Sequence, residues 1–503
     1  MTLTFLLAPL NGNLRYEAGV KTAATASAAG TFSHRPLAFR VLSDGVFRVS
    51  AAMTDTIVGF ELAVRLVVLL LAVSAGLLLW QGLLRRGVRD AGLHAGVVVG
   101  ALVLLGPISA AEPEWSAVVL TTAGLGLALL GRRNPWLWAA LAGTAFVAAA
   151  GLKIISLPTA CLGLAAVALI DRRQALRTLG ACLGVGLLYV LATVIWVPWE
   201  VQWLLDIRTV QNSALDAVPG APAFFVQLAA ERPVLVALPA ALVLDGTRER
   251  ILVMIAAAVC CATVLVQGQY FDYHAIPLVV VATVAVFRSY RGRVNPAIGL
   301  AAAGLIAVTT VMTGLPGGWL SNHERVWTAT LVIIATAAVV WTVRTRSWDA
   351  GRRVIPSLAA ALTGLALLYP GASPWSAHLL MPVDTDGNRP QTTIESRDSK
   401  TVTAEQVRRV LGGPEAPVTY LTFGEWTYFI GNPTSCRYPS PLFLQRTRKP
   451  DRLPTRSYRE NLKCLSAPDA RWLIVDPSWF IASRQPPEVK TVLDTEWDCE
   501  NSV

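Results

Sequence analysis

Residues 11–56 form a polar segment whose side chains are suited to proton transfer and phosphate binding. Glu17 is a carboxylate that can deprotonate a hydroxyl as a general base, and Asp44 is a second acid in the same segment. The planar arginine fork binds phosphate oxygens through two hydrogen bonds. Three basic residues are candidates for that role, namely His34, Arg35 and Arg40. The competing interpretations are a solvated loop acid and a basic helix resting on lipid headgroups.

Two acids and a lysine follow at the ends of apolar runs. The hairpin AEPEW holds Glu112 and Glu114 beside Trp115, and an acid next to an aromatic ring suits a sugar. A tryptophan anchor at the membrane surface is the alternative. Lys153 lies in GLKIISLP between two short apolar runs, where a cation is costly and indicates a functional site. A lipid phosphate is its expected partner, and snorkelling to the interface is the alternative.

Two further stretches place polar residues at the mouths of apolar runs. QGQYFDYHAIP brings Asp272, Tyr273 and His274 there, and we expect His274 to bind a phosphate or orient an acid. A structural histidine is the equal alternative. VPWEVQWLLDIR, which contains Glu200 and Trp203, predicts an interfacial helix first and a ligand contact second.

The rest of the chain has the composition of a membrane protein. Of its 503 residues, 54% are hydrophobic and 15% are charged, whereas soluble domains carry about 25% charge. Apolar runs of about 17–20 residues recur between 57 and 370, and each is long enough to cross a bilayer. The net charge of +10 lies mostly in short arginine clusters between these runs. Such clusters indicate cytoplasmic loops, so nucleic acid is excluded as a partner.

We therefore predict an all-α polytopic membrane protein of about 12–13 transmembrane helices with a small extracytoplasmic α/β C-terminal domain. Basic clusters recur at every second connection, which predicts a cytoplasmic N-terminus and an outer C-terminal domain in the cell membrane. A partial first helix is expected at 1–10, with a short interfacial segment as the alternative. The other predicted spans are 57–81, 92–110, 115–130, 135–151, 155–170, 179–197, 232–245, 250–267, 275–289, 296–314, 326–343 and 354–370.

The composition changes after residue 370, which divides the chain into a membrane domain, 1–370, and an outer domain, 371–503. The stretch 381–400 is polar and turn-rich, and predicts a linker or extended arm. TAEQ at 403–406 predicts a capped helix that ends at two glycines, Gly412 and Gly413. VTYLTF and RWLIVD, further on, predict short buried strands.

Three of the seven cysteines, Cys436, Cys464 and Cys499, fall in the predicted outer domain, where disulfides persist. Closing the loop between Cys436 and Cys464 stabilises a fold by roughly 3 kcal/mol, so we predict that these two are bonded and Cys499 is spare. No metal-ligand spacing is present. No cofactor is therefore predicted, and dependence on a divalent metal stays open. The chain also lacks the Walker, GxGxxG, HExxH and GxSxG motifs, which argues against ATP-driven transport, hydride transfer and serine or zinc hydrolysis.

The acid-bearing first loop, the EPEW hairpin, the GLKIISLP turn, the Tyr273–His274 pair and the outer C-terminal domain together resemble a known family. They are similar to GT-C type polyprenyl-phosphate-sugar-dependent integral membrane glycosyltransferases of bacterial, and more narrowly actinobacterial, cell envelopes. The resemblance implies transfer of a sugar from a polyprenyl-phosphate donor to an envelope glycan, lipid or protein acceptor. The reaction would occur on the extracytoplasmic face, generally with inversion.

The resemblance also implies roles for individual residues. Glu17 would be the base and Glu112 or Glu114 a second acid. Three residues would bind the phosphate, namely Arg35, Lys153 and His274. Family members usually carry an aspartate directly after the first helix, whereas this chain has Asn11 and Asn13 there, and Glu17 is the only acid before Asp44.

Two other classes share the predicted membrane helices. A lipid or polysaccharide transporter or flippase would have the same apolar bundle and a cationic cavity, but would need neither an outer α/β domain nor a pair of acids. A non-catalytic envelope-assembly protein would have a similar topology but would tolerate loss of Glu17.

Overall fold

The computed structural model describes most of the chain up to residue 289 and most of the C-terminal domain. The described residues are 10–23, 35–131, 133–210, 220–232, 234–244, 247–268, 270–289, 390–445, 455–466 and 470–497, with isolated positions between 326 and 340. Several predictions lie outside this set, namely the partial first helix up to residue 9, the spans 296–314 and 354–370, most of the span 326–343, the domain boundary at 370, and the residues His34 and Cys499.

Within the described residues, five helices are long and apolar enough to cross a membrane. They are α4 (Ile57–Arg85), α6 (Pro113–Leu130), α7 (Pro135–Leu152), α9 (Arg172–Trp196) and α14 (Thr247–Gln267). The other helices of the bundle are α5 (Ala91–Ser109), η1 (Ile154–Ser156), α8 (Leu157–Ile170), α12 (Ala221–Glu231), α13 (Val234–Leu244), η3 (Asp272–Ala275) and α15 (Ile276–Ser289). These helices confirm the prediction of an all-α polytopic membrane protein.

Helix α9 begins seven residues before the predicted span at 179. The Asp171 side chain accepts a hydrogen bond from the Gln174 backbone N–H at 2.9 Å and so caps the helix. Arg172 and Arg173, which we expected in a connecting loop, therefore lie in the first turn of α9. Hydropathy alone misses this turn because its side chains are polar.

The bundle is held by close helix packing in the order α4, α6, α7 and α9. Gly82 of α4 and Gly126 of α6 face each other, and a Cβ added at Gly82 would lie 2.5 Å from the Gly126 carbonyl oxygen. Small residues let two membrane helices approach to backbone contact, which adds van der Waals attraction that lipid cannot supply.

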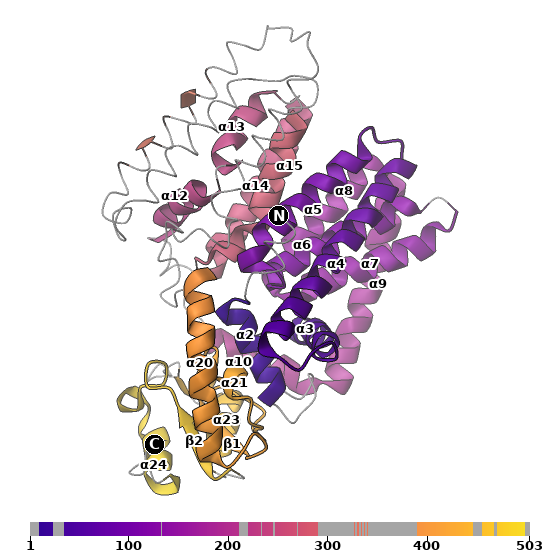
Figure 1. Cartoon of the computed structure of the whole chain (residues 1–503). Coiled ribbons are helices and arrows are strands. Elements are labelled where there is room, and N and C mark those ends of the chain that lie inside the picture. The colour runs from indigo at the N-terminus through magenta and orange to yellow at the C-terminus, as the bar shows by residue number, and fades with distance from the viewer. Residues whose placement is uncertain are drawn as a thin grey trace.

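The polar segment 11–56 folds as two helices, α2 (Gly12–Ala23) and α3 (Leu37–Ala51). Helix α2 is buried along most of its length. Helix α10 (Pro198–Val210) follows α9 and confirms the predicted helix in VPWEVQWLLDIR. Figure 1 shows the bundle with the C-terminal domain at one end, and α2 and α10 in the region where they meet.

The C-terminal domain pairs two short parallel strands, β1 (Val418–Leu421) and β2 (Trp472–Val475), with Val418 opposite Trp472. Both strands confirm the sequence prediction, although β2 is only partly buried. Parallel strands need a crossover connection, and helices supply it here. The helices are α20 (Pro390–Leu411), α21 (Trp426–Ile430), α22 (Leu442–Gln445), α23 (Arg456–Ser466), η4 (Ala482–Arg484) and α24 (Pro487–Glu496).

The helix predicted from TAEQ is longer than its capping box suggests. Helix α20 begins at Pro390, so the second half of the predicted linker 381–400 is helical. Ion pairs from Arg397 to Glu61 and from Lys400 to Glu425 fix this extra part against α4 and α21, and neither partner is local in sequence. The helix ends as predicted: Gly412 and Gly413 have positive φ angles of 88° and 125°.

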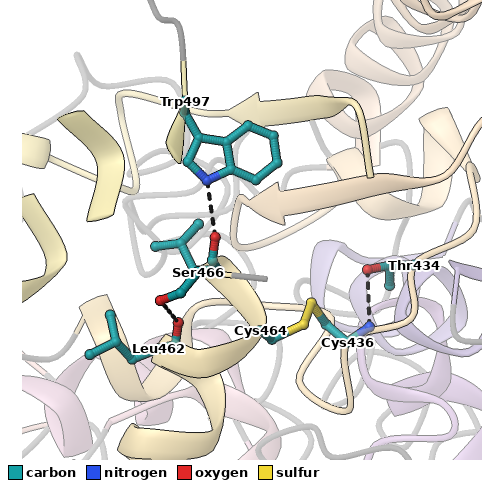
Figure 2. Close-up of a disulfide and its surroundings, with 7 residues drawn as sticks. Thr434, Cys436, Leu462, Cys464, Ser466 and Trp497 are labelled. Atoms are coloured by element: carbon teal, nitrogen blue, oxygen red, sulfur yellow. Dashed lines mark hydrogen bonds between the residues drawn. A yellow bond between two sulfur atoms is a disulfide. The ribbon is translucent and has the colours of Figure 1, made fainter. Parts of the chain in front are cut away.

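A disulfide joins Cys436 and Cys464, whose Cα atoms are 5.7 Å apart (Figure 2). It ties the segment after α21 to helix α23. Near it, the Trp497 indole N–H donates to the Leu465 carbonyl at 3.1 Å and holds the end of α24 on the same helix.

The C-terminal domain packs against α10 as well. The Asp206 carboxylate of α10 accepts a hydrogen bond of 2.8 Å from the Ser457 backbone N–H in the first turn of α23. Trp203 is buried in the same apolar core as Phe443 and Phe480 of the domain. Contacts with α4 and α10 therefore hold the domain against the end of the bundle.

Candidate functional site

The two acids of the EPEW hairpin are buried at the start of α6. Ala111 has a positive φ of 67° and turns the chain between α5 and α6. Glu112 then precedes Pro113, the first residue of α6, and accepts hydrogen bonds from Asn11 Nδ2 at 3.0 Å and from Arg35 Nη2 at 3.2 Å. Asn11 also accepts from the Leu14 backbone N–H at 2.8 Å, so it joins the start of α2 to this acid.

Arg35 lies between two carboxylates. Its Nε donates to Glu17 Oε1 at 3.3 Å, and its Nη2 donates to Glu112. All three side chains are at most 5% exposed. Burial alone would lower the pKa of Arg35, but the adjacent Tyr273, Glu112 and Glu17 outweigh burial and raise it. The guanidinium is therefore firmly charged.

Lys153 forms the centre of the other half of the site. It occupies the extended residue between α7 and η1, where the helix breaks. Its Nζ donates to Glu114 Oε1 at 2.7 Å and to Gln267 Oε1 at 2.5 Å, and lies 3.1 Å from His274 Nε2. The Tyr273 ring lies 5.9 Å away, within cation–π range. The ammonium group of the α7–α8 connection is thus contacted from two other connections, between α5 and α6 and between α14 and α15.

The two halves are continuous. Glu112 and Glu114 are two residues apart, and Tyr273, which faces Arg35, is followed by His274, which faces Lys153. The combined cluster, called here the charged cluster, contains Glu17, Arg35, Glu112, Glu114, Lys153, Tyr273 and His274. In a buried site, fixed cations can stabilise an anionic leaving group. The carboxylates beside them can accept a proton.

Among the described residues, two side chains in or next to the charged cluster have a buried oxygen without a hydrogen-bond partner. These oxygens are Glu114 Oε2 and Ser156 Oγ, in residues that are 3% and 2% exposed. Buried polar atoms are nearly always hydrogen-bonded, so such atoms indicate where a ligand's hydroxyl groups or a water could bind. Ser156 follows Lys153 by three residues and donates its backbone N–H to the Lys153 carbonyl at 2.7 Å.

Arg40 lies elsewhere, although the sequence grouped it with Arg35. It forms an ion pair with Glu200 of α10 and packs over the Trp203 ring. The Leu37 backbone N–H donates to the same carboxylate at 2.8 Å. Burial raises the pKa of Glu200, and Arg40 and the Leu37 N–H oppose that shift. This pair holds α3 on α10.

Other sequence-predicted residues also lie outside the charged cluster. Asp44 of α3 forms ion pairs with Lys21 of α2 at 2.9 Å and with Arg48 of its own helix at 3.0 Å. Trp115 is buried, and its indole N–H donates to the Leu102 carbonyl at 3.0 Å, so its ring packs inside the bundle. His34 and the Asp272 side chain lie outside the described residues.

Sequence reasoning did not assign two residues that belong to the site. Asn11 was noted only as standing where related enzymes carry an acid, and Gln267 only as part of a polar outer stretch. Both use amide groups to bind a charged member of the cluster. Each lies next to a helix end that carries a candidate acid or cation, and this position was the signal in the sequence that could have identified it.

Among the described residues, no group of three or more histidine, cysteine or acidic residues has the geometry to hold a metal ion. The fold and the charged cluster together define a class: an all-α polytopic membrane protein with a buried cluster of paired acidic and basic side chains at one end of its helices, beside a small α/β domain.

No family model matches the chain, and no curated protein matches it. Among solved structures, two crystal structures of ArnT from Cupriavidus metallidurans are similar, one in the apo state and one bound to undecaprenyl phosphate. Each match covers 86% of this chain and 82% of the ArnT chain with a TM-score of 0.48, at 15% and 16% sequence identity respectively. A functional assignment therefore rests on this chain's own residues.

Proposed function

We propose that this protein is a GT-C type glycosyltransferase that moves a sugar from a polyprenyl-phosphate donor to an envelope acceptor on the extracytoplasmic face of the cell membrane. The observation that carries the proposal is the charged cluster, in which Arg35 lies against Glu17 and Lys153 against Glu114. A phosphate-linked sugar needs cations for its phosphate and a carboxylate for the acceptor hydroxyl. Both kinds of group meet here, at the ends of membrane helices where a lipid headgroup would lie.

The cations would bind the donor phosphate and stabilise the leaving group. When the bond between the anomeric carbon and the phosphate oxygen breaks, the electron pair moves to that oxygen. Arg35 and Lys153 would stabilise the added negative charge, with His274 as a further ligand. Because the phosphate is already a competent leaving group, the enzyme needs no acid to protonate it.

Glu17 would act on the acceptor. As the acceptor oxygen forms its bond to the anomeric carbon, Glu17 accepts the hydroxyl proton. One displacement of this kind inverts the anomeric configuration, so we propose an inverting reaction. Glu114, with one oxygen on Lys153 and the other without a partner, would bind a hydroxyl of the sugar or the acceptor.

The donor would be identified by purifying the protein and analysing its co-purifying lipid by mass spectrometry. Turnover is then loss of that donor after membranes from the source cell are added, and binding is measured with undecaprenyl phosphate, the ligand of one of the similar structures. Glu17→Gln should keep lipid binding and lose about 10²–10⁴ in rate, because a positioned base is removed. Arg35→Ala should instead weaken lipid binding.

Asp44→Asn is the matched control, because Asp44 is an acid of the same segment whose ion pairs lie outside the charged cluster. It should turn over at the parental rate. Full activity of Glu17→Gln would exclude Glu17 as the base. Full activity of both Glu17→Gln and Arg35→Ala would favour a transporter or a non-catalytic assembly protein.

A further inference from the structure

One face of helix α2 is attached to the C-terminal domain. Arg15, Gly19 and Ala23 are spaced four residues apart, so they share a face. Arg15 Nη1 contacts Glu425 Oε2 at 2.6 Å, and the Thr434 backbone N–H donates to the Ala23 carbonyl at 2.7 Å. Gly19 packs on α21, so all three residues of this face contact the domain.

Gly19 packs directly on the backbone of the C-terminal domain. A Cβ at this position would lie 2.7 Å from the Thr427 carbonyl carbon and would also collide with the Tyr428 backbone nitrogen. Both atoms belong to the main chain of α21 and cannot rotate away, so α2 would have to separate from α21 to accept any side chain.

Charged and polar contacts secure the same junction. Arg15 is fully buried and bridges Glu61 of the membrane helix α4, at 2.8 Å, to Glu425 at the start of α21. Lys400 of α20 holds Glu425 from the other side at 3.2 Å. The Tyr16 hydroxyl is hydrogen-bonded to Ser440 at 2.7 Å. These contacts fix the face of α2 that carries Arg15 and Gly19 against the domain.

Glu17 projects from the other side of this helix. It follows Arg15 by two residues, which rotates it by about 200° around the helix axis, and there it meets Arg35 in the charged cluster. We propose that the C-terminal domain positions the base Glu17 through α2, with Gly19 and Glu425 as positioning residues. The inference rests on the proposed role of Glu17, and it makes the domain part of the catalytic unit.

The sharpest test compares two glycine substitutions. Gly19→Ala should lower turnover at saturating donor by about 10²-fold, because a displacement of about 1 Å is enough to misplace a catalytic group. Binding of undecaprenyl phosphate should stay at the parental value, since the proposed phosphate ligands Arg35, Lys153 and His274 are not on α2. Gly45→Ala is the matched control: it is a helical glycine of the same segment, and a Cβ there meets nothing within 4 Å.

A second pair of variants tests the ion pair. Glu425→Gln should lower turnover and speed hydrogen exchange of the α2 amides. Glu460→Gln is its control, because Glu460 pairs with Arg437 and Arg456 in the same domain without contacting α2. It should leave both quantities at the parental values.

Parental turnover of Gly19→Ala would overturn the inference. Equal losses of lipid binding and turnover in Gly19→Ala would also overturn it, since they would assign Gly19 to folding alone. Glu17→Gln is measured in parallel to separate the two proposals. If Glu17→Gln is inactive and Gly19→Ala is fully active, the positioning role fails and the proposed function stands. If Glu17→Gln is active, the proposed function itself fails.

Discussion

At the scale of single residues, Lys153 binds side chains from segments that lie far apart in the sequence. An ammonium group has three N–H donors, and Lys153 faces three acceptors, in Glu114, Gln267 and His274. A donor phosphate would therefore have to replace one of them. The neutral partners Gln267 and His274 are easier to replace than the Glu114 carboxylate, because hydrogen bonds between charged groups are the stronger ones.

Lys153→Met should weaken binding of undecaprenyl phosphate by about 10- to 100-fold, because a charge-assisted hydrogen bond is lost. The methionine keeps the length of the side chain and its apolar stem. Equilibrium binding in detergent or nanodiscs measures the effect. Lys490→Met, at an exposed position of α24, should bind like the parent, and equal binding by both variants would remove Lys153 from the phosphate site.

At the scale of elements, the short interfacial helices orient the site. Helix α3 starts two residues after Arg35, and its first turn is held by α10 through the bonds that Arg40 and the Leu37 N–H make to Glu200. Because the start of α3 is fixed in this way, the positions that the Arg35 side chain can reach are limited.

Glu200→Ala should destabilise this junction by about 3–5 kcal/mol, because it leaves Arg40 buried without its carboxylate. Hydrogen exchange of the α3 amides should become faster while that of α6 and α7 stays unchanged. Glu405→Ala, an exposed acid of α20, provides the comparison. Unchanged exchange in α3 would show that other contacts hold the helix.

At the scale of the whole molecule, the two ends of the helix bundle carry different groups. Contacts of Arg86 with Asp171 and the Leu129 carbonyl join the connections rich in arginine at one end. The charged cluster joins the opposite helix ends, where the C-terminal domain also lies (Figure 1). From the positive-inside rule, we expect the arginine-rich end to face the cytoplasm and the charged cluster to face outward.

Reporter fusions test this orientation. A reporter fused after Gly87, in the connection between α4 and α5, should report the cytoplasm, and one fused after Val503 should report the exterior. The same result from both fusions would contradict the proposed side of the C-terminal domain, and with it an extracytoplasmic reaction.

The amino-acid sequence by itself determined the five described membrane-spanning helices, apart from the first turns of α9, and also the two strands and the glycines that end α20. These features depend on the length of apolar runs, on short buried apolar stretches and on backbone freedom, which are properties of neighbouring residues. It also singled out Glu17, Arg35, Glu112, Glu114, Lys153, Tyr273 and His274, because polar groups next to apolar runs are costly and therefore conspicuous.

Only the tertiary structure decided which of these groups are partners. Arg35 meets acids 18 and 77 positions away, and Arg15 meets one 410 positions away. Arg40 and Asp44 looked equivalent to Arg35 and Glu17 in the sequence, yet helix rotation and packing direct them to other neighbours. The start of α20 was missed for the same reason, because ion pairs across the fold, and not local composition, hold its first turns.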